Sequence, residues 1–313
     1  MIKQHLGSYK IPKKVLVNLK HMGNIKEICY QDRVNRNIYI KKLSDDEYVY
    51  LPTGEIIQCK HIKNRSENLF QVSQSLKRLR DYINTNVQEP MNCRWITLTY
   101  SDNMTDTKRL YKDFKNFMKR LKYSFKQYNI EYIVAMEPQG RGAWHAHLIL
   151  IFDRKAPYIP NKIIENLWSQ GFTKTKMLVD IDNVGAYLTA YLGDMECTTE
   201  NLKLLGISPN DLRIKLVDSI DGIELKKPKK FIKGGRLYLY PPKFNLYRCS
   251  RGIKKPISEL ITYENAIKKI GHMQPTFSSA LTLTEFDIAT DKPRFSKTIA
   301  YEFYNTKRLI AQD

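Results

Sequence analysis

Apolar residues between positions 64 and 195 repeat with two different periods, which predict alternating strands and helices. Leu69, Val72, Leu76, Leu79 and Ile83 recur at helical spacing. Four apolar runs bounded by turn residues predict strands, at 95–100, 131–137, 144–152 and 172–179. Helices are predicted at 64–86, 106–128, 160–170 and 182–192.

The order of these elements predicts one two-layer domain. After the first helix, the chain runs strand, helix, strand, strand, helix, strand, and a last helix follows. This order matches the ferredoxin-like (RRM-like) split βαβ arrangement, so the predicted fold class is α+β with an antiparallel sheet as its palm. The first and third strands of that arrangement lie side by side, which places Thr97 and Thr99 next to the strand at 144–152.

The flanks of this core have a different character. Residues 1–62 contain short β-rich pieces at 27–30, 37–40 and 47–51. Residues 196–313 are basic, with predicted strands at 236–242 and 298–304, the latter pairing with 282–290. We therefore divide the chain into a β-rich region over 1–62, a core over 63–195, and a basic extension over 196–313 that contacts DNA and packs on the core.

Charge points to a polyanionic partner. The 313 residues include 52 Lys and Arg against 32 Asp and Glu, a net charge of +20, which favours nucleic acid. The 20 Tyr and 12 Phe suit stacking on unpaired bases where they lie among basic residues. A merely basic surface is the alternative. The candidate DNA contacts in the extension are Arg236, Arg248, Arg251 and Lys254.

Cysteine usage and hydropathy indicate a cytoplasmic protein. The five cysteines are odd in number and contain no CxxC, which predicts reduced thiols and no disulfide framework. The first residues show no signal-peptide pattern, and no run of about 18 apolar residues predicts a membrane span.

The stretch from Tyr132 to Phe152 carries the strongest candidate chemistry. A Pro-Gln-Gly-Arg-Gly turn joins two predicted strands, and the second strand contains His145 and His147. Alternate residues of a strand share a face, so both imidazoles project together. Glu137 ends the facing strand, and its carboxylate reaches the same point if the two strands pair.

Two imidazoles and one carboxylate form a ligand set that leaves coordination positions open for a substrate. An isolated His-x-His on a strand is more often packing or surface, and Glu137 across a short connection shifts that balance towards a metal. The last predicted helix adds Tyr187 and Tyr191, whose spacing of four residues places both on one side. Such a pair alone is usually core packing.

Beside a metal and a basic surface, the tyrosine pair predicts attack on a DNA phosphodiester. A phenol with a pKa of about 10 is a weak nucleophile unless assisted, and a divalent cation activates the phosphorus. Attack leaves a 5′-phosphotyrosyl link and a free 3′-hydroxyl, which can later reseal the strand. The second tyrosine permits a second strand transfer, as in a cycle of nicking, displacement and rejoining.

Three motifs in order resemble the rolling-circle replication initiators of the HUH endonuclease superfamily. Ile96-Thr97-Leu98-Thr99-Tyr100 resembles their first motif and His145-Ala146-His147 their histidine motif. Tyr187-Leu188-Thr189-Ala190-Tyr191 resembles the third motif of the two-tyrosine, phage A-type and gene II-like initiators and their plasmid relatives. The resemblance covers residues 64–195 and is weaker in the basic C-terminal part.

The resemblance implies a Mg²⁺ or Mn²⁺ ion and single-stranded or hairpin origin DNA as substrate. It implies nucleophilic roles for Tyr187 and Tyr191, and metal-ligand roles for His145, His147 and Glu137. Many relatives carry a lysine three residues after the first tyrosine, where this chain has Ala190. Arg141, Lys174 and Lys176 are the candidates to replace it. No GxxxxGK[ST] motif is present, so the helicase, like the polymerase, is expected to be a host protein.

Three alternatives stay open from the sequence. The same chemistry serves conjugative mobilisation and transposition. A non-catalytic single-strand binding protein on an RRM-like sheet would bind DNA without a divalent metal. A zinc hydrolase would use the His/His/Glu set and leave the tyrosine pair unexplained.

Overall fold

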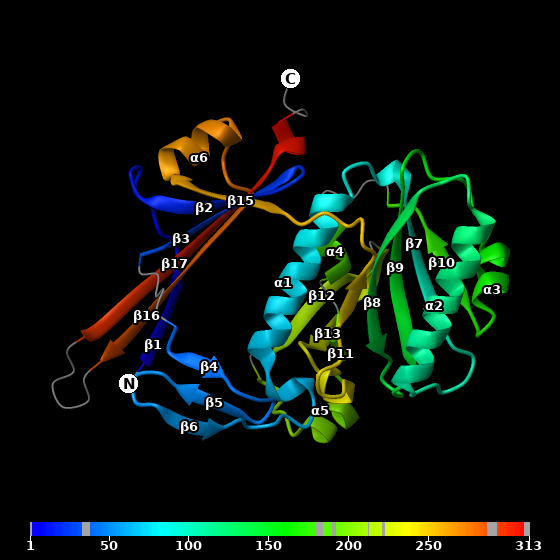
Figure 1. Ribbon diagram of the computed structural model, residues 1–313, viewed down its shortest axis with the longest axis horizontal. Coiled ribbons are helices and arrows are strands. Elements are labelled where there is room, and N and C mark those ends of the chain that lie inside the picture. Colours follow the sequence, from blue (N-terminus) through cyan, green and yellow to red (C-terminus); the bar gives the residue numbers. More distant parts are fainter. Residues whose placement is uncertain are drawn as a thin grey trace. The chain divides into compact units, whose positions relative to one another are not determined.

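The computed structural model describes residues 2–32, 38–178, 184–189, 192–211, 213–220, 223–286 and 293–309. The chain forms two compact units (Figure 1). The first unit combines Met1–His61 with Pro256–Asp313, and the second is the continuous segment Ile62–Lys255.

The second unit is built on a five-stranded sheet in the order β10-β7-β9-β8-β14, and every pairing is antiparallel. Its strands are β7 (Cys93–Thr99), β8 (Ile130–Pro138), β9 (Trp144–Phe152), β10 (Thr173–Lys176) and β14 (Tyr247–Cys249). The first four strands have the ferredoxin-like order, which confirms the predicted α+β palm. β7 and β9 pair centrally as predicted, with Thr97 opposite His147 and Thr99 opposite His145.

One face of this sheet carries the main core of the unit. Helices α2 (Thr107–Ser124) and α3 (Asn161–Trp168) cover it (Figure 1). The apolar side of α2 packs into a cluster with alternate residues of β7, β8 and β9, which include Ile96, Leu98, Val134, Ala146 and Leu148. Asp106 caps α2 by accepting a hydrogen bond from the backbone N–H of Lys108 at 2.7 Å.

The opposite face is covered by α1 (Leu69–Asn86), against which the short helix α4 (Val184–Thr189) packs. Leu79 and Ile83 of α1 share a buried cluster with Trp95, Ile133 and Ile149 of the sheet. Because strand side chains alternate, Thr97, His145, His147 and Glu137 lie on this α1 face. The fold therefore places the histidine pair between the sheet and the helix layer that contains α4.

The predicted elements of the core are present with adjusted ends. A 3₁₀ turn, η1 (Arg65–Glu67), precedes α1, and another, η2 (Pro90–Asn92), precedes β7. The helix predicted from Asp182 begins at Val184 among the described residues, and Asp182 itself lies outside them. The predicted strand at 236–242 is wrong, because the 3₁₀ turn η3 (Leu237–Leu239) occupies that position.

A three-stranded sheet completes this unit. It has the order β11-β13-β12, with β11 (Met195–Glu196), β12 (Ile214–Ile220) and β13 (Ile223–Ile232), and α5 (Thr199–Leu205) follows β11. β11 continues the chain that leaves α4, so this small sheet and η3 approach the end of β8 that bears Glu137. The contacts of Glu137 with residues 193 and 236 come from here.

The other unit contains a six-stranded sheet in the order β1-β16-β17-β3-β2-β15. Its strands are β1 (Ile2–Gly7), β2 (Leu16–Met22), β3 (Ile25–Gln31), β15 (Ile257–Thr262), β16 (Phe277–Phe286) and β17 (Pro293–Asn305). Helix α6 (Tyr263–Ile270) packs on it, and η4 (Thr306–Leu309) follows β17. β4 (Ile40–Lys42), β5 (Glu47–Tyr50) and β6 (Glu55–Gln58) form a separate sheet.

These pairings change the expected domain division. Thr282 pairs with Thr298 as predicted, but β17 also pairs with β3, and β15 pairs with β2. Residues 256–313 therefore complete the sheet of residues 1–61, and the basic extension does not pack as one segment on the core. Within the described ranges, no helix is both long enough and apolar enough to cross a membrane.

Candidate metal centre

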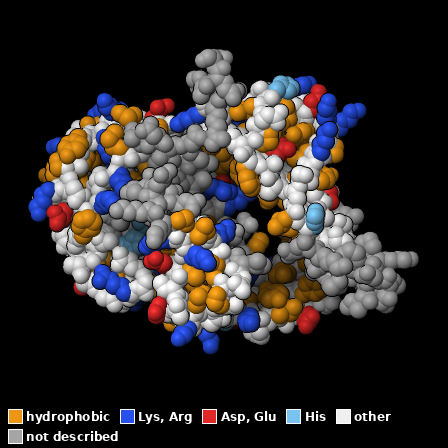
Figure 2. Space-filling view, turned by 180° about the vertical axis from the view of Figure 1, so that it is seen from behind, with side chains coloured by type: hydrophobic (Ala, Val, Ile, Leu, Met, Phe, Trp, Pro, Cys, Tyr) orange, Lys and Arg blue, Asp and Glu red, His pale blue; other side chains and the backbone are white. Residues whose placement is uncertain are grey.

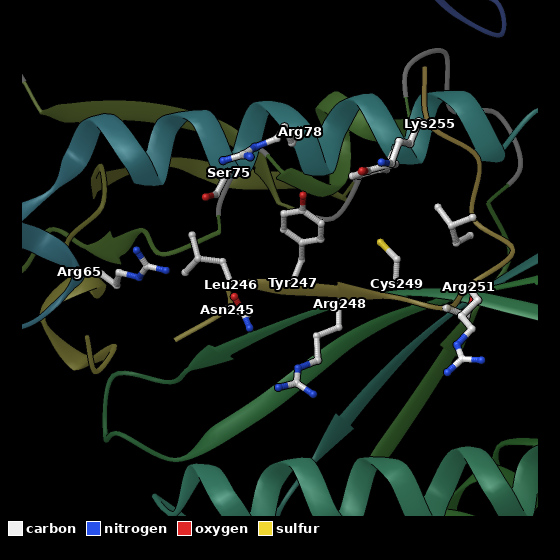
Figure 3. A pocket seen from close by; sticks show the side chains of 13 residues that line it. Arg65, Ser75, Arg78, Asn245, Leu246, Tyr247, Arg248, Cys249, Arg251 and Lys255 are labelled. Carbon is white, nitrogen blue, oxygen red and sulfur yellow. The ribbon is translucent and has the colours of Figure 1, made fainter. Parts of the chain in front are cut away.

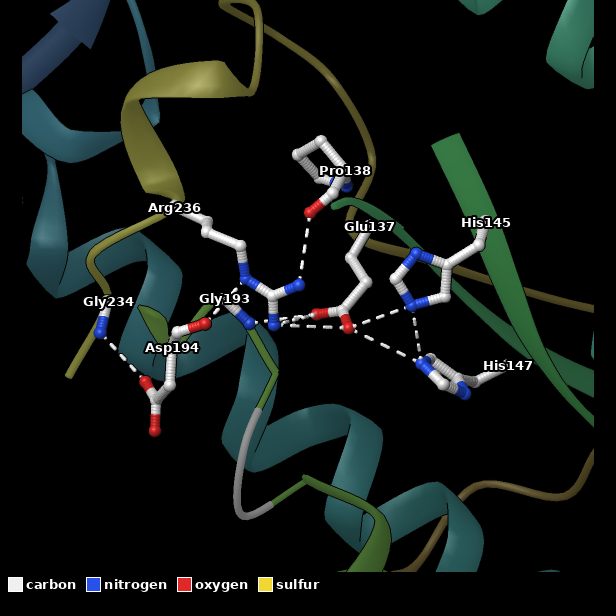
Figure 4. Close-up of polar contacts among 8 residues, drawn as sticks. All are labelled: Glu137, Pro138, His145, His147, Gly193, Asp194, Gly234 and Arg236. Atoms are coloured by element: carbon white, nitrogen blue, oxygen red, sulfur yellow. Dashed lines mark hydrogen bonds and ion pairs between the residues drawn. The ribbon is translucent and has the colours of Figure 1, made fainter. Parts of the chain in front are cut away.

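Glu137, His145 and His147 converge beside the turn of the β8–β9 hairpin (Figure 4). The turn closes with a hydrogen bond from the N–H of Gly142 to the carbonyl of Gln139, and Gly142 has φ of 89°, a conformation that favours glycine. The resulting register sets Glu137 directly opposite His145. Neighbouring cross-strand side chains then meet on the α1 face of the sheet.

The three ligand atoms form a nearly equilateral triangle. His145 Nε2 lies 2.9 Å from His147 Nε2 and 3.1 Å from Glu137 Oε1, and His147 Nε2 lies 3.3 Å from the same oxygen. Adjacent ligands of an octahedral cation with bonds of about 2.1 Å lie about 3.0 Å apart. The donor set therefore fits one face of an octahedral divalent cation and leaves the other positions for water or substrate.

The three ligands differ in exposure. The side chains of Glu137 and His145 are 6% and 8% exposed, whereas that of His147 is 25% exposed. His147 therefore marks the side from which a substrate reaches the cluster. The Nδ1 atoms of both imidazoles are buried without a hydrogen-bond partner in the described part of the chain.

Electrostatics keep the cluster in the form that binds cations. Burial alone would raise the pKa of Glu137, but hydrogen bonds from both histidines and the charge of Arg236 hold that pKa well below its usual value. Burial lowers the pKa of His145, and it outweighs the hydrogen bond to Glu137, which acts in the opposite direction. Glu137 is therefore ionised and His145 neutral at pH 7, as metal ligands must be.

Arg236 supports the cluster from behind instead of facing a DNA groove. Its guanidinium lies 3.3 Å from Glu137 Oε1 and donates to the carbonyl oxygens of Pro138 and Asp194 (Figure 4). Its side chain is only 15% exposed. The structure therefore corrects the DNA contact predicted at this residue, because the charge is used to neutralise and orient a buried carboxylate.

The segment that carries the two tyrosines is held at both ends. The backbone N–H of Gly185 in α4 donates to Asn84 Oδ1 on α1 at 2.9 Å. A Cβ on Gly185 would lie 2.4 Å from that oxygen, so glycine permits the close packing of α4 on α1. Eight residues later, the N–H of Gly193 donates to Glu137 Oε2 at 2.9 Å. The chain between these contacts is thereby tied to the metal cluster.

Tyr187 lies on α4 between the two anchors. The structure describes its backbone position but not its side chain, and Ala190 and Tyr191 lie outside the described residues. Asp194 follows the second anchor, where Oδ1 accepts a hydrogen bond from the N–H of Gly234 at 2.7 Å. Burial raises the pKa of Asp194 despite that bond.

Basic residues predicted to replace the motif lysine lie on the sheet beside the cluster. Lys174 pairs with Thr97, which in turn pairs with His147, so all three occupy one row on the α1 face. Lys176 lies two residues further along, with Nζ 5.4 Å from the centre of the Trp95 ring. Arg141 is exposed in the β8–β9 turn.

The remaining predicted DNA contacts are exposed at the other edge of the sheet. Arg248 lies on β14, and its guanidinium carbon is 3.6 Å from the centre of the Tyr111 ring on the α2 side. Arg251 and Lys254 follow β14 and are also exposed. Figure 2 shows Lys and Arg side chains spread more widely than Asp and Glu over the face it presents.

Sequence reasoning missed the supporting residues Asn84, Gly193 and Asp194. Asn84 had one usable signal, because it adjoins the apolar stripe of α1 yet is polar and buried. Gly193 and Asp194 act through backbone groups, which no local pattern identifies. Together, the fold and the site define a ferredoxin-like palm with a histidine pair on its central hairpin.

Comparison with known proteins gives this class a family context. Residues 93–196 match the family model described as replication-associated protein ORF2/gene 2 protein. The matched segment begins with β7 and ends in β11, so it contains all three cluster residues and α4. A search of curated proteins found no match.

Proposed function

We propose that this protein initiates rolling-circle DNA replication by nicking and rejoining single-stranded or hairpin origin DNA through a 5′-phosphotyrosine intermediate. The coarser part of this statement, a replication-associated role, is supported by the family match over residues 93–196. The observation that carries the catalytic part is the hydrogen bond from Gly193 to Glu137. It ties the tyrosine segment to the carboxylate that completes the histidine cluster.

The cluster supplies the electrophilic half of the reaction. Glu137, His145 and His147 would hold Mg²⁺ or Mn²⁺, and Arg236 keeps Glu137 ionised and oriented. A bound divalent cation polarises the nonbridging oxygens of a phosphodiester and stabilises charge on the leaving oxygen. The phosphate approaches from the His147 side, which is the exposed side of the triangle.

Tyr187 supplies the nucleophile in this proposal. Its phenolic oxygen forms a bond to phosphorus while the bond from phosphorus to the 3′-oxygen breaks, and the phenolic proton passes to the 3′-oxygen. The strand is left with a free 3′-hydroxyl and a 5′-phosphate esterified to the protein. Reversal by a 3′-hydroxyl reseals DNA, and Tyr191 accepts a second strand while the first link persists.

The test is covalent capture of DNA. The protein is incubated with a random pool of single-stranded oligonucleotides and Mn²⁺, and linked peptides are mapped by mass spectrometry. We expect a nucleotide on Tyr187, loss of that adduct in Tyr187→Phe, and retention of DNA binding. Tyr123→Phe is the matched control, because Tyr123 is 81% exposed on the far side of the sheet.

The outcomes separate the competing functions. An adduct that persists in Tyr187→Phe through Tyr191 would reverse the order of the two nucleophiles. Tight binding with no adduct in any metal would indicate a non-catalytic single-strand binding protein. Hydrolysis that requires Zn²⁺ and leaves no adduct would indicate a zinc hydrolase. Mobilisation and transposition share the adduct, so mapping of the recognised DNA within the encoding element distinguishes them.

A further inference from the structure

A basic groove lies at the edge of the palm sheet, between α1 and β14 (Figure 3). Its volume is about 450 Å³, and thirteen residues line it. The charged members are all cationic, and none of the lining residues is acidic: Arg65, Arg78, Arg248, Arg251 and Lys255. In the described part of the chain, none of these five cations forms an ion pair.

The groove is separate from the cluster of Glu137 and the histidines. Tyr247 of β14 pairs with Ala135 of β8, which pairs with His147 of β9. With strands about 4.8 Å apart, Tyr247 lies two strands, or about 10 Å, from the His147 row. Leu79 and Ile83 of α1 fill the space over Ala135 and Ile133 between the two sites.

The walls of the groove are fixed by contacts across long sequence distances. The Asn86 side chain donates to the carbonyl of Lys254 at 2.8 Å and accepts from its N–H at 2.9 Å. This pair of bonds holds the chain after β14 against the end of α1. At the other end, Arg65 donates to the carbonyl of Phe244 at 2.6 Å. The cations are therefore presented by a rigid frame rather than by a loose loop.

Polar and aromatic groups complete the lining. The rings of Tyr82 and Tyr247 lie 6.0 Å apart, and Figure 3 shows Tyr247 pointing from β14 towards α1. Arg78 projects from α1 with one hydrogen bond, to the carbonyl of Gln74. The Arg248 guanidinium turns to the other side of β14 and rests on Tyr111. A channel of cations without acidic partners, with aromatic walls, suits a phosphodiester strand with exposed bases.

We propose that this groove binds a single-stranded segment of the substrate DNA outside the cleaved linkage, so that it selects and orients the strand. The proposal rests on the proposed function for the meaning of "substrate". No lining residue falls within residues 93–196, the part matched by the replication-associated family. The groove is therefore a feature that this chain adds to the palm, where strand selection is separate from cleavage.

The test compares two double variants that each remove two positive charges. Arg78→Gln with Lys255→Gln alters the groove, and Lys112→Gln with Lys115→Gln alters exposed positions of α2 on the opposite side of the sheet. Binding of a fluorescent single strand of about 25 nucleotides, a length that spans more than one typical single-strand site, is measured by anisotropy in EDTA over a range of salt concentrations. Because EDTA prevents cleavage, the result does not depend on catalysis.

We expect the groove variant to weaken binding about tenfold and the control less than about twofold. Loss of two phosphate contacts should also reduce the slope of log K against log salt by about 1.4. Equal shifts in both double variants would overturn the proposal, as would equal weakening of a blunt duplex of the same length. Loss of competition by inorganic pyrophosphate alone, with DNA binding unchanged, would show an anion pocket only.

A single charge reversal, Arg251→Glu, gives a second measurement at an exposed position if the double variant does not fold. It should weaken single-strand binding at least as much as the double variant, and unchanged binding counts against the groove. The metal-dependent adduct assay of the wild-type protein is run in parallel. Groove-dependent binding without an adduct removes the nickase and keeps the groove, whereas an adduct with no groove effect does the reverse.

Discussion

Two clusters in this molecule use the same residue types and behave differently. Each unit contains a glutamate held between histidine and a cation. In the palm, Glu137 contacts His145, His147 and Arg236. In the six-stranded sheet, Glu259 lies 2.7 Å from His21 and 2.5 Å from Lys269.

Burial and ligand number separate the two clusters. The Glu137 side chain is 6% exposed, whereas that of Glu259 is 28% exposed and Lys269 is 51% exposed. Water screens the second cluster, so its attractions contribute little. The first offers two imidazoles on one strand face and an arginine that is withdrawn behind the carboxylate. A chelating site therefore depends on strand register and desolvation more than on the presence of histidine and glutamate.

The largest effect that tests this comparison is removal of an imidazole. His147→Ala should lower the rate of Mn²⁺-dependent cleavage by about 10²–10³-fold, because the cation loses one of three protein ligands and the substrate its entry side. His21→Ala, the corresponding change in the exposed cluster, should leave cleavage within about twofold of wild type. The rates are measured in single-turnover reactions with saturating oligonucleotide. Equal rates for the two variants would remove the metal centre from the mechanism.

The next effect concerns the cations that accompany each glutamate. Arg236→Met should weaken Mn²⁺ binding about 10–100-fold, as loss of a residue that orients a ligand commonly does. Lys269→Met is the control, since Lys269 contacts a carboxylate outside the metal cluster. Affinity is measured by titration followed with electron paramagnetic resonance. If Arg236 acted only through its positive charge, its removal would strengthen cation binding, and a rise in affinity would contradict the positioning role.

The palm cluster is largely predictable from the sequence, and its support is not. Two-residue periodicity and a glycine-rich turn are local signals, and they predict the boundaries of β9 as found, at 144–152. Those same signals place Glu137 opposite His145. Arg236 is 99 residues from Glu137 in the chain, and no pattern records that distance. Its basic, aromatic neighbourhood predicts a strand facing DNA, yet the chain forms a 3₁₀ turn that points the guanidinium inwards.

The predicted domain division differs from the structure for a related reason. Alternation in β15, β16 and β17 predicts strands but does not say which sheet they join, and their partners include strands of the first 31 residues. Charge is an equally weak guide, since Arg248 and Arg236 both lie in basic stretches. One rests on an aromatic ring at an exposed edge and the other neutralises a buried carboxylate.

A smaller effect follows from the lowered pKa of His145. Burial favours its neutral form in the folded state, whereas the unfolded chain protonates at about pH 6.5. Stability is therefore complete above that pH and falls as pH drops below it, by at most about 1.4 kcal/mol per pH unit. Urea unfolding between about pH 7.5 and pH 5.5, which brackets the unfolded-state pKa, measures this in the metal-free protein. His145→Gln should flatten the dependence, and an unchanged slope would show that other groups cause it.

The smallest effect is expected where the two clusters differ most. Hydrogen bonds from Lys269 and His21 lower the pKa of Glu259, which is partly exposed. Glu259→Gln should therefore change the melting temperature only slightly, and the difference should disappear in about 1 M salt, where charges are screened within about 3 Å. The matched change Glu137→Gln should keep its effect at high salt, because buried charges are screened much less. A salt-resistant loss at Glu259 would mean that exposure does not separate the two clusters, and that the chelating site needs another explanation.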